Sequence, residues 1–234
     1  MQSGLSRSLA AYLKRSGATS GPAARAALGL AVALACLAAL LGLAELAGGD
    51  ALRRAWALSK GPVLAGEVWR LVTAHLVHLS PMHTFLNILG LGLVGATMWA
   101  ILTPARLGLA VLVSGAAISA GWMLLEPAGP SYVGFSGITH GLYAFGSLLM
   151  LRAGPRWLGA VLLAGLTVKL GHEAVLGAVP GAEAEIGGKV SLLSHALGSL
   201  GGALAAAGAP GVPRVIVVLV AAALATWHAA PWAG

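Results

Sequence analysis

Two residues that lie far apart in this sequence, Ser136 and His195, have the side chains that nucleophilic catalysis requires. A serine hydroxyl is a weak nucleophile at its own pKa, and an adjacent imidazole is a common base that activates it. Ser136 stands between Gly134 and Gly137, and glycines leave room for a substrate backbone to approach. His195 lies in an apolar segment, where an ionisable side chain is costly and is a candidate functional residue. Each signal also has a plain alternative: a chance Gly-x-Ser-Gly in a glycine-rich helix, and a histidine that only binds a backbone carbonyl.

Glycine spacing offers a way to bring the two side chains together. Gly198 and Gly202 follow His195 by three and seven residues, so all three share one face of a helix. Gly137 and Gly141 form a similar small face just after the serine. Small residues four apart let two membrane helices approach closely. We therefore expect these two helices to pack together and to place the imidazole beside the hydroxyl.

His83 and Asn87 are four residues apart and face the same way on a helix. A neutral imidazole and an amide can each donate a hydrogen bond to a developing oxyanion. The histidines of this region also raise the alternative of a metal site. No further carboxylate or thiolate is clearly placed to complete a zinc set, so we expect no metal and no cofactor. The metal alternative rests on His75, His78 and His83, with His172 and Glu173 as further candidates.

Lys169 and Glu173 are spaced four apart in another apolar segment. We interpret them as a structural ion pair, because pairing within one helix lowers the cost of both charges in lipid. A catalytic role is the weaker alternative. With His172, the same pair could instead line the ion path of a small transporter.

The composition excludes a soluble globular domain and favours a membrane protein. Hydrophobic residues make up 58% of the chain and charged residues only 9%, against roughly 25% charged in ordinary domains. The net charge of +7 does not indicate nucleic-acid binding, because the basic residues are scattered between apolar runs. Membrane lipid is the expected surrounding. The single cysteine, Cys36, can form no intrachain disulfide.

The apolar runs predict an all-α polytopic membrane protein with six spans and a seventh, shorter one at the C-terminus. Residues 1–25 are expected to form a basic cytoplasmic segment, residues 26–208 a six-span domain, and residues 209–234 a C-terminal segment with the extra span. Residues 48–77 are expected to form an interfacial loop. The expected spans are 26–47, 80–102, 107–125, 135–151, 157–177, 190–208 and 215–230.

The charges predict which side of the membrane each loop faces, because short cytoplasmic loops are enriched in lysine and arginine. With the N-terminus in the cytoplasm, the inside segments hold Arg7, Lys14, Arg15, Arg25, Arg106, Arg152, Arg156 and Arg214. The outside segments hold fewer basic residues, namely Arg53, Arg54, Lys60, Arg70 and Lys189. We therefore expect a multi-pass membrane protein whose serine and histidine lie near the outer side.

Three of these motifs together resemble those of the rhomboid intramembrane proteases. They are His83-x-x-x-Asn87, Gly-x-Ser136-Gly and His195-x-x-Gly-x-x-x-Gly, each in the span where that family carries it. Trp69-Arg70 is similar to a Trp-Arg pair of the family, and the resemblance covers about residues 26–208. It implies a dyad with Ser136 as nucleophile and His195 as general base, and no acidic third member. It also implies an oxyanion site formed by the Ser136 amide, His83 and Asn87, with His78 as a supporting loop residue.

One position resembles a particular branch of that family, the rhombosortases. Many rhomboids have a tyrosine one turn after the serine, whereas this chain has His140, as in the rhombosortase pattern Gly-x-Ser-Gly-x-x-His-Gly. The Lys169-x-x-x-Glu173 pair is also similar. This resemblance implies transmembrane substrates with a C-terminal tail made of a Gly-Gly motif, a transmembrane helix and a basic cluster. The alternatives are a general rhomboid protease, a non-proteolytic rhomboid-like protein that binds membrane clients, and a small transporter.

Overall fold

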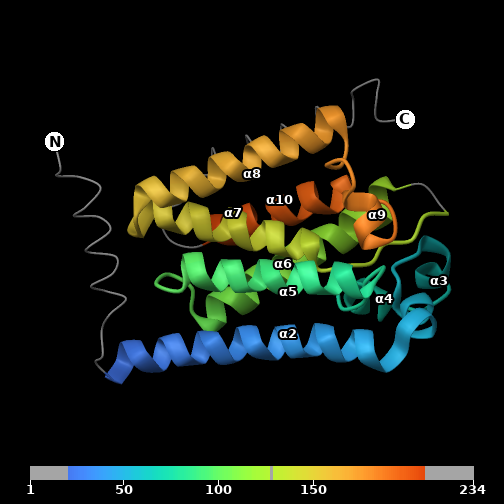
Figure 1. Cartoon of the computed structure of the whole chain (residues 1–234), viewed down its shortest axis with the longest axis horizontal. Coiled ribbons are helices and arrows are strands. Elements are labelled where there is room, and N and C mark those ends of the chain that lie inside the picture. The colour runs from blue at the N-terminus through green and yellow to red at the C-terminus, as the bar shows by residue number, and fades with distance from the viewer. Residues whose placement is uncertain (1–20, 127–128, 209–234) are drawn as a thin grey trace.

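Six long helices run side by side in the computed structural model, which describes residues 21–126 and 129–208 (Figure 1). Three short helices lie at one end of this bundle (Figure 1). The long helices are α2 (Gly21–Trp56), α5 (Pro81–Met98), α6 (Pro104–Leu125), α7 (Ser136–Ala153), α8 (Arg156–Leu176) and α10 (Leu192–Gly208). The short helices are α3 (Lys60–Leu64), α4 (Arg70–Thr73) and α9 (Ala182–Ile186).

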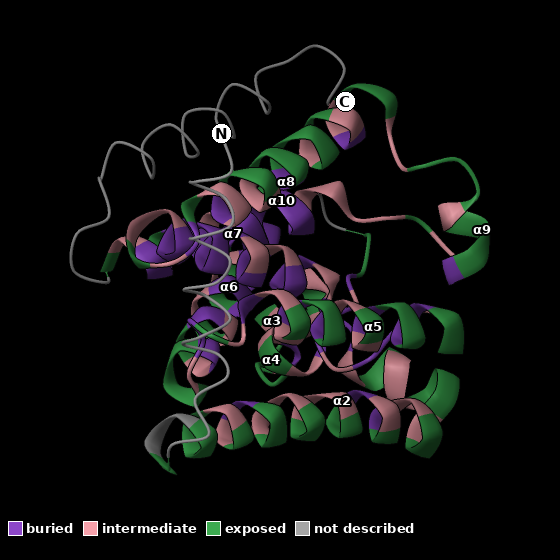
Figure 2. Ribbon diagram, turned by 60° about the vertical axis from the view of Figure 1, so that its left-hand side comes forward, coloured by how far each residue is buried: buried purple, intermediate pink, exposed green. Residues whose placement is uncertain are grey.

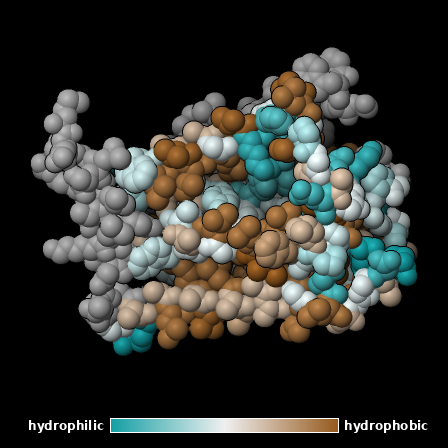
Figure 3. Space-filling view, viewed as in Figure 1, coloured by the Kyte–Doolittle hydropathy of each residue, from teal (hydrophilic) through white to brown (hydrophobic). Residues whose placement is uncertain are grey.

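The predicted all-α membrane fold is confirmed for the described residues. The part of α2 from Ala24 onward, α6 and α8 are each long and apolar enough to cross a membrane, and α10 is a shorter apolar helix. Hydrophobic side chains cover much of the visible surface, while hydrophilic ones gather over α8 and at the end that carries α3, α4 and α9 (Figure 3). The predicted seventh span, 215–230, and most of the predicted 1–25 segment lie outside the described residues.

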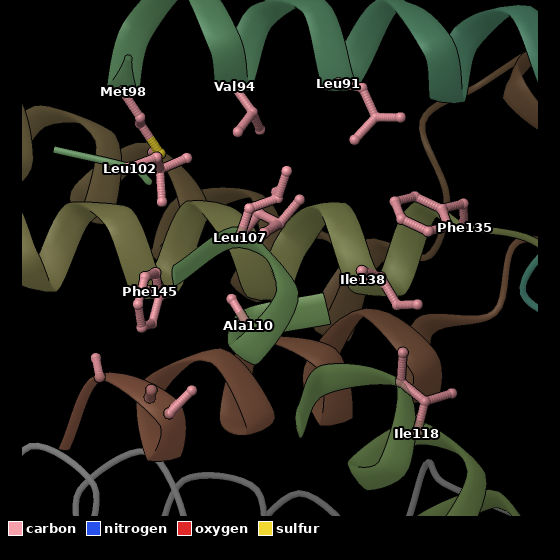
Figure 4. Packing of buried hydrophobic residues seen from close by; sticks show 14 of the residues in the cluster. Leu91, Val94, Met98, Leu102, Leu107, Ala110, Ile118, Phe135, Ile138 and Phe145 are labelled. Carbon is pink, nitrogen blue, oxygen red and sulfur yellow. The ribbon is translucent and has the colours of Figure 1, made fainter. Parts of the chain in front are cut away.

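The helices differ in how deeply they are packed. α7 and α10 form the buried centre, whereas α2 and α8 expose most of their surface (Figure 2). Apolar side chains fill the space between α5 and α7. Leu91, Val94 and Met98 of α5 point toward α7, whereas Phe145 points to the opposite side of α7 (Figure 4).

Glycines let α7 and α10 approach until their backbones touch. A Cβ atom on Gly198 would lie 1.9 Å from the carbonyl oxygen of Gly137. A Cβ atom on Gly202 would lie 1.9 Å from the carbonyl oxygen of Gly141. No real contact is that short, so only glycine fits at Gly198 and Gly202 with this helix spacing. The structure thus has the small-residue packing that the sequence predicted.

The prediction of a loop over residues 48–77 is wrong for its first part, because α2 continues to Trp56. The helix changes direction at Gly49, whose φ of 43° is a conformation that glycine adopts readily. The following turns are polar and Arg53 donates to the Leu79 carbonyl over 2.7 Å. The sequence does not indicate this extension, because the apolar run ends at the kink whereas the helix continues to Trp56.

The segment after α2 is held by the buried side chain of Arg70. Its guanidinium donates to the carbonyls of Arg54 and Ala57, over 2.7 and 2.8 Å, and pairs with Glu67. One arginine therefore satisfies two backbone acceptors and ties α4 to the end of α2. The neighbouring Trp69 is half-exposed and donates only a long hydrogen bond of 3.4 Å.

The helix contact makes a prediction about Gly198. A Gly198→Ala variant must push α10 away from α7, which we expect to cost about 1–3 kcal/mol of stability. The thermal unfolding midpoint in detergent should fall accordingly. Gly165→Ala is the matched control, because no atom lies within 4 Å of a Cβ at Gly165 in the interior of α8. Equal midpoints for Gly198→Ala and the control would contradict the close contact.

Candidate active site

The candidate site lies where the first turns of α5, α7 and α10 meet the last turns of α8. A cavity of about 440 Å³ opens there, with α9 along its edge. Most of the polar side chains singled out from the sequence line it. They are His83, Asn87, Ser136, His140, Glu173 and His195, with Lys169 at the margin.

Ser136 and His195, which are 59 residues apart in the sequence, form a hydrogen bond. The Ser136 Oγ lies 3.0 Å from His195 Nε2. Ser136 is the first residue of α7, and His195 lies in the first turn of α10. Because Gly137 and Gly198 hold these helices in contact, the distance between the two side chains follows from the helix packing.

The sequence reasoning missed an acidic partner of the imidazole. The other ring nitrogen of His195, Nδ1, lies 2.9 Å from Glu173 Oε2 and 3.2 Å from Oε1. Glu173 comes from α8, a helix that contributes no residue to the expected dyad. It also pairs with Lys169, so the expected ion pair is present with a third member added. A signal existed, since Glu173 is an acid close to the outer end of its predicted span.

His140 packs flat against the imidazole of His195. The ring centroids are 4.0 Å apart and the planes differ by 13°. The His140 Nδ1 lies 2.8 Å from the Ser136 carbonyl oxygen and so donates its proton there. The neutral ring therefore keeps its lone pair on Nε2, a buried atom with no hydrogen-bond partner among the described residues. The stack limits the rotation of His195 from one side.

The loop before Ser136 depends on Gly134, whose φ of 122° strongly favours glycine. Its N–H donates to the Ala74 carbonyl over 2.9 Å, and its own carbonyl accepts from the Tyr132 hydroxyl over 2.6 Å. A Cβ atom here would lie 3.0 Å from the His83 ring. Gly134 thus lets the loop turn and lets His83 approach the serine.

His83 is oriented with its Nε2 toward this loop. The backbone N–H of Leu79 donates to His83 Nδ1 over 3.3 Å. Because Nδ1 is the acceptor, a neutral His83 carries its proton on Nε2. This nitrogen lies 3.2 Å from the Cβ position of Gly134, beside the start of α7. The side chain therefore presents a donor to the cavity.

Asn87 and His78 support this arrangement. The Asn87 amide lines the cavity and donates one hydrogen bond to the His83 carbonyl over 2.9 Å. His78 accepts a hydrogen bond of 3.4 Å from the Phe135 N–H and packs edge-on against His83 at 5.0 Å. Burial lowers the pKa of His78 to about 3, so this loop imidazole remains neutral and can accept.

His75 does not join the site. Its Nε2 lies 3.1 Å from the Ser119 hydroxyl, which itself donates to the Leu71 carbonyl over 2.6 Å. Burial lowers the pKa of His75 to about 4, so it serves as a neutral link between its loop and α6. The suggested metal group of His75, His78 and His83 therefore does not assemble.

A different trio brings potential metal ligands together in the described part of the chain. His140, Glu173 and His195 each place one ligand atom within 4.8 Å of the others. The two imidazoles, however, are stacked nearly parallel. Their lone pairs lie in separate planes, so one ion could not meet both rings in plane without rotating them apart. Ser136 and Glu173 already occupy both ring nitrogens of His195, and the Ser136 carbonyl occupies Nδ1 of His140.

Comparison with known proteins gives one family. A family model described as a rhomboid domain matches residues 65–210, which is more than half of the 234-residue chain. A search of curated proteins found no match. The matched range contains every residue of the cavity and five of the six long helices.

Proposed function

Because this chain belongs to the rhomboid family, whose members include intramembrane serine proteases, we propose that it is a peptidase with Ser136 as nucleophile and His195 as base. The observation that carries the proposal is the 3.0 Å separation of Ser136 Oγ and His195 Nε2 inside a polar cavity. The family match begins at residue 65, so a protease domain that extends over residues 26–208 is part of the proposal.

The reaction proceeds through an acyl-enzyme in this proposal. His195 Nε2 takes the proton from Ser136 Oγ as the oxygen attacks the scissile carbonyl carbon. The imidazolium then gives that proton to the departing amine when the C–N bond breaks. A water molecule attacks the acyl carbon next, His195 takes the water's proton, and Ser136 leaves with a proton restored.

The developing oxyanion meets three donors near the start of α7. The Ser136 N–H belongs to the first turn of the helix, where backbone N–H groups have no partner within the helix. His83 presents Nε2–H, and Asn87 has a second amide hydrogen besides the one given to the His83 carbonyl. Donors fixed before the reaction stabilise charge that forms in the transition state.

The second half of the reaction needs water. Polar groups at membrane depth are tolerated where they line a water-filled cavity. The cavity is lined by side chains from α5, α7, α8 and α10, and also by Ser131 in the loop before α7. This loop lies outside the helices and Ser131 is exposed, so water can enter from that end.

The substrate we propose is a transmembrane protein with a rhombosortase-type C-terminal tail. The support is His140, which follows the serine in the pattern Gly-x-Ser-Gly-x-x-His-Gly and stacks on His195. Cleavage near a Gly-Gly motif would release the substrate from its membrane helix and basic cluster.

The proposed location is the inner membrane, with the cavity opening to the periplasm. All seven acidic residues of the chain lie in the half of the bundle that contains the cavity. The opposite end carries Arg25, Arg106, Arg152 and Arg156, and short loops with such charges face the cytoplasm.

The dyad predicts the effect of two substitutions on proteolysis. Ser136→Ala and His195→Ala should each lower cleavage of a co-expressed transmembrane substrate by at least about 10³-fold. Ser147→Ala is the matched control, since it removes a hydroxyl from the same helix far from the cavity. Undiminished cleavage by either active-site variant, measured by immunoblot and in purified form, would overturn the dyad.

The proposed C-terminal tail of the substrate predicts the position of the cleavage site. Co-expression with a reporter that carries a Gly-Gly motif, a transmembrane helix and a basic cluster should yield one released product. Mass spectrometry should place its new C-terminus at or beside the Gly-Gly motif. Replacement of both glycines by leucine should abolish release.

Other outcomes would identify the alternatives. Equal cleavage of an unrelated transmembrane protein would point to a general rhomboid protease. Binding of the reporter without cleavage would point to a client-binding protein. Solute flux in liposomes that survives Ser136→Ala would point to a transporter.

A further inference from the structure

Glu173, Lys169 and His195 form a chain of contacts behind the serine. One carboxylate oxygen of Glu173 accepts a hydrogen bond from His195 Nδ1, and the other forms an ion pair with Lys169 Nζ. On the far side of the imidazole, Nε2 faces Ser136 Oγ. The two nitrogens of one ring thus connect an acid to a hydroxyl, with separations of 2.9 and 3.0 Å.

The position of the acid matters because a neutral imidazole has only one N–H. His195 accepts the serine proton only if its lone pair is on Nε2 and its hydrogen is on Nδ1. An ionised carboxylate accepts hydrogen bonds and cannot donate them, so Glu173 selects this tautomer. The same charge stabilises the imidazolium that forms when the proton arrives.

The different burial of Glu173 and Lys169 distinguishes a role for Glu173 at His195 from that of a simple ion pair. The Glu173 side chain is 5% exposed, whereas the Lys169 side chain is 44% exposed. The Lys169 ammonium is half-exposed on the lining of the cavity, so it depends less on Glu173 than the buried carboxylate depends on a partner. A buried carboxylate needs a partner, and Lys169 supplies one four residues away on α8. Lys169 therefore pairs with the buried carboxylate of Glu173, and that carboxylate accepts a hydrogen bond from His195.

We infer that Glu173 is a positioning residue that holds His195 in its reactive tautomer, with Lys169 keeping the carboxylate ionised. This inference rests on the proposed Ser136–His195 function and adds a third member that the family resemblance did not imply. It also assigns the Lys169–Glu173 pair to the chemistry of the site. No new bond forms at Glu173, because the proton stays on His195 Nδ1 throughout the reaction.

The kinetic test uses Glu173→Gln and the double variant Lys169→Met/Glu173→Gln. A positioning role predicts that Glu173→Gln lowers kcat by about 10²- to 10⁴-fold with KM changed by less than about threefold. The double variant should be no more active than Glu173→Gln. A merely structural ion pair predicts that removal of both charges restores kcat, and that result would overturn the inference. Glu185→Gln, an exposed acid on α9, is the control and should match the wild type.

The spectroscopic test does not depend on activity. In the inactive Ser136→Ala protein, NMR of ¹⁵N-labelled histidine should assign the His195 proton to Nδ1, with a resonance far downfield of ordinary amides. The resonance should be lost in Ser136→Ala/Glu173→Gln. A His195 proton found on Nε2 in Ser136→Ala would overturn the inference. Failure of the proposed function would look different, as a wild-type protein that cuts no substrate whatever the tautomer.

Discussion

The contact between the backbones of α7 and α10 is the constraint on which the rest of the site depends. In a bilayer, apolar helices gain little free energy by exchanging lipid contacts for helix contacts. Close packing of small residues therefore drives their association. Here Gly198 and Gly202 press against the carbonyls of Gly137 and Gly141. Two such contacts, four residues apart on each helix, fix both the spacing and the register. Ser136 precedes the first contact on α7 and His195 precedes it on α10, so their distance is set by the backbone.

The surrounding elements hold the polar side chains of this site in defined states. His83 is oriented by a loop N–H, His140 by the carbonyl of Ser136, and His195 by a carboxylate. In each ring the partner decides which nitrogen carries the proton. The Leu79 N–H at His83 Nδ1 leaves the His83 proton on Nε2, whereas acceptor oxygens at Nδ1 of His140 and His195 keep those protons on Nδ1. Such order has a physical cause, since a buried polar group without a partner costs about 1–3 kcal/mol. The hydrogen bonds that satisfy these buried side chains therefore also fix their orientations.

The sequence predicted the features that depend on local pattern. The six long helices, the glycine faces and the Ser136–His195 pair follow from apolar runs and residue spacing. The Glu173 contact could not be found that way, because it depends on which side of α8 turns toward α10. The extension of α2 past Gly49 was also hidden, since the polar turns that follow resemble a loop in composition. Spacing within a helix can be counted, whereas the rotation of one helix against another is decided by packing.

If the helix packing makes Ser136 a nucleophile, this serine should react with a covalent serine-protease probe. Purified protein in detergent would be treated with a fluorophosphonate and analysed by intact mass and peptide mapping. We expect a single adduct on Ser136 in the wild type, and none in a folded His195→Ala variant. Labelling that is absent from the folded wild type, or that persists unchanged without His195, would contradict it.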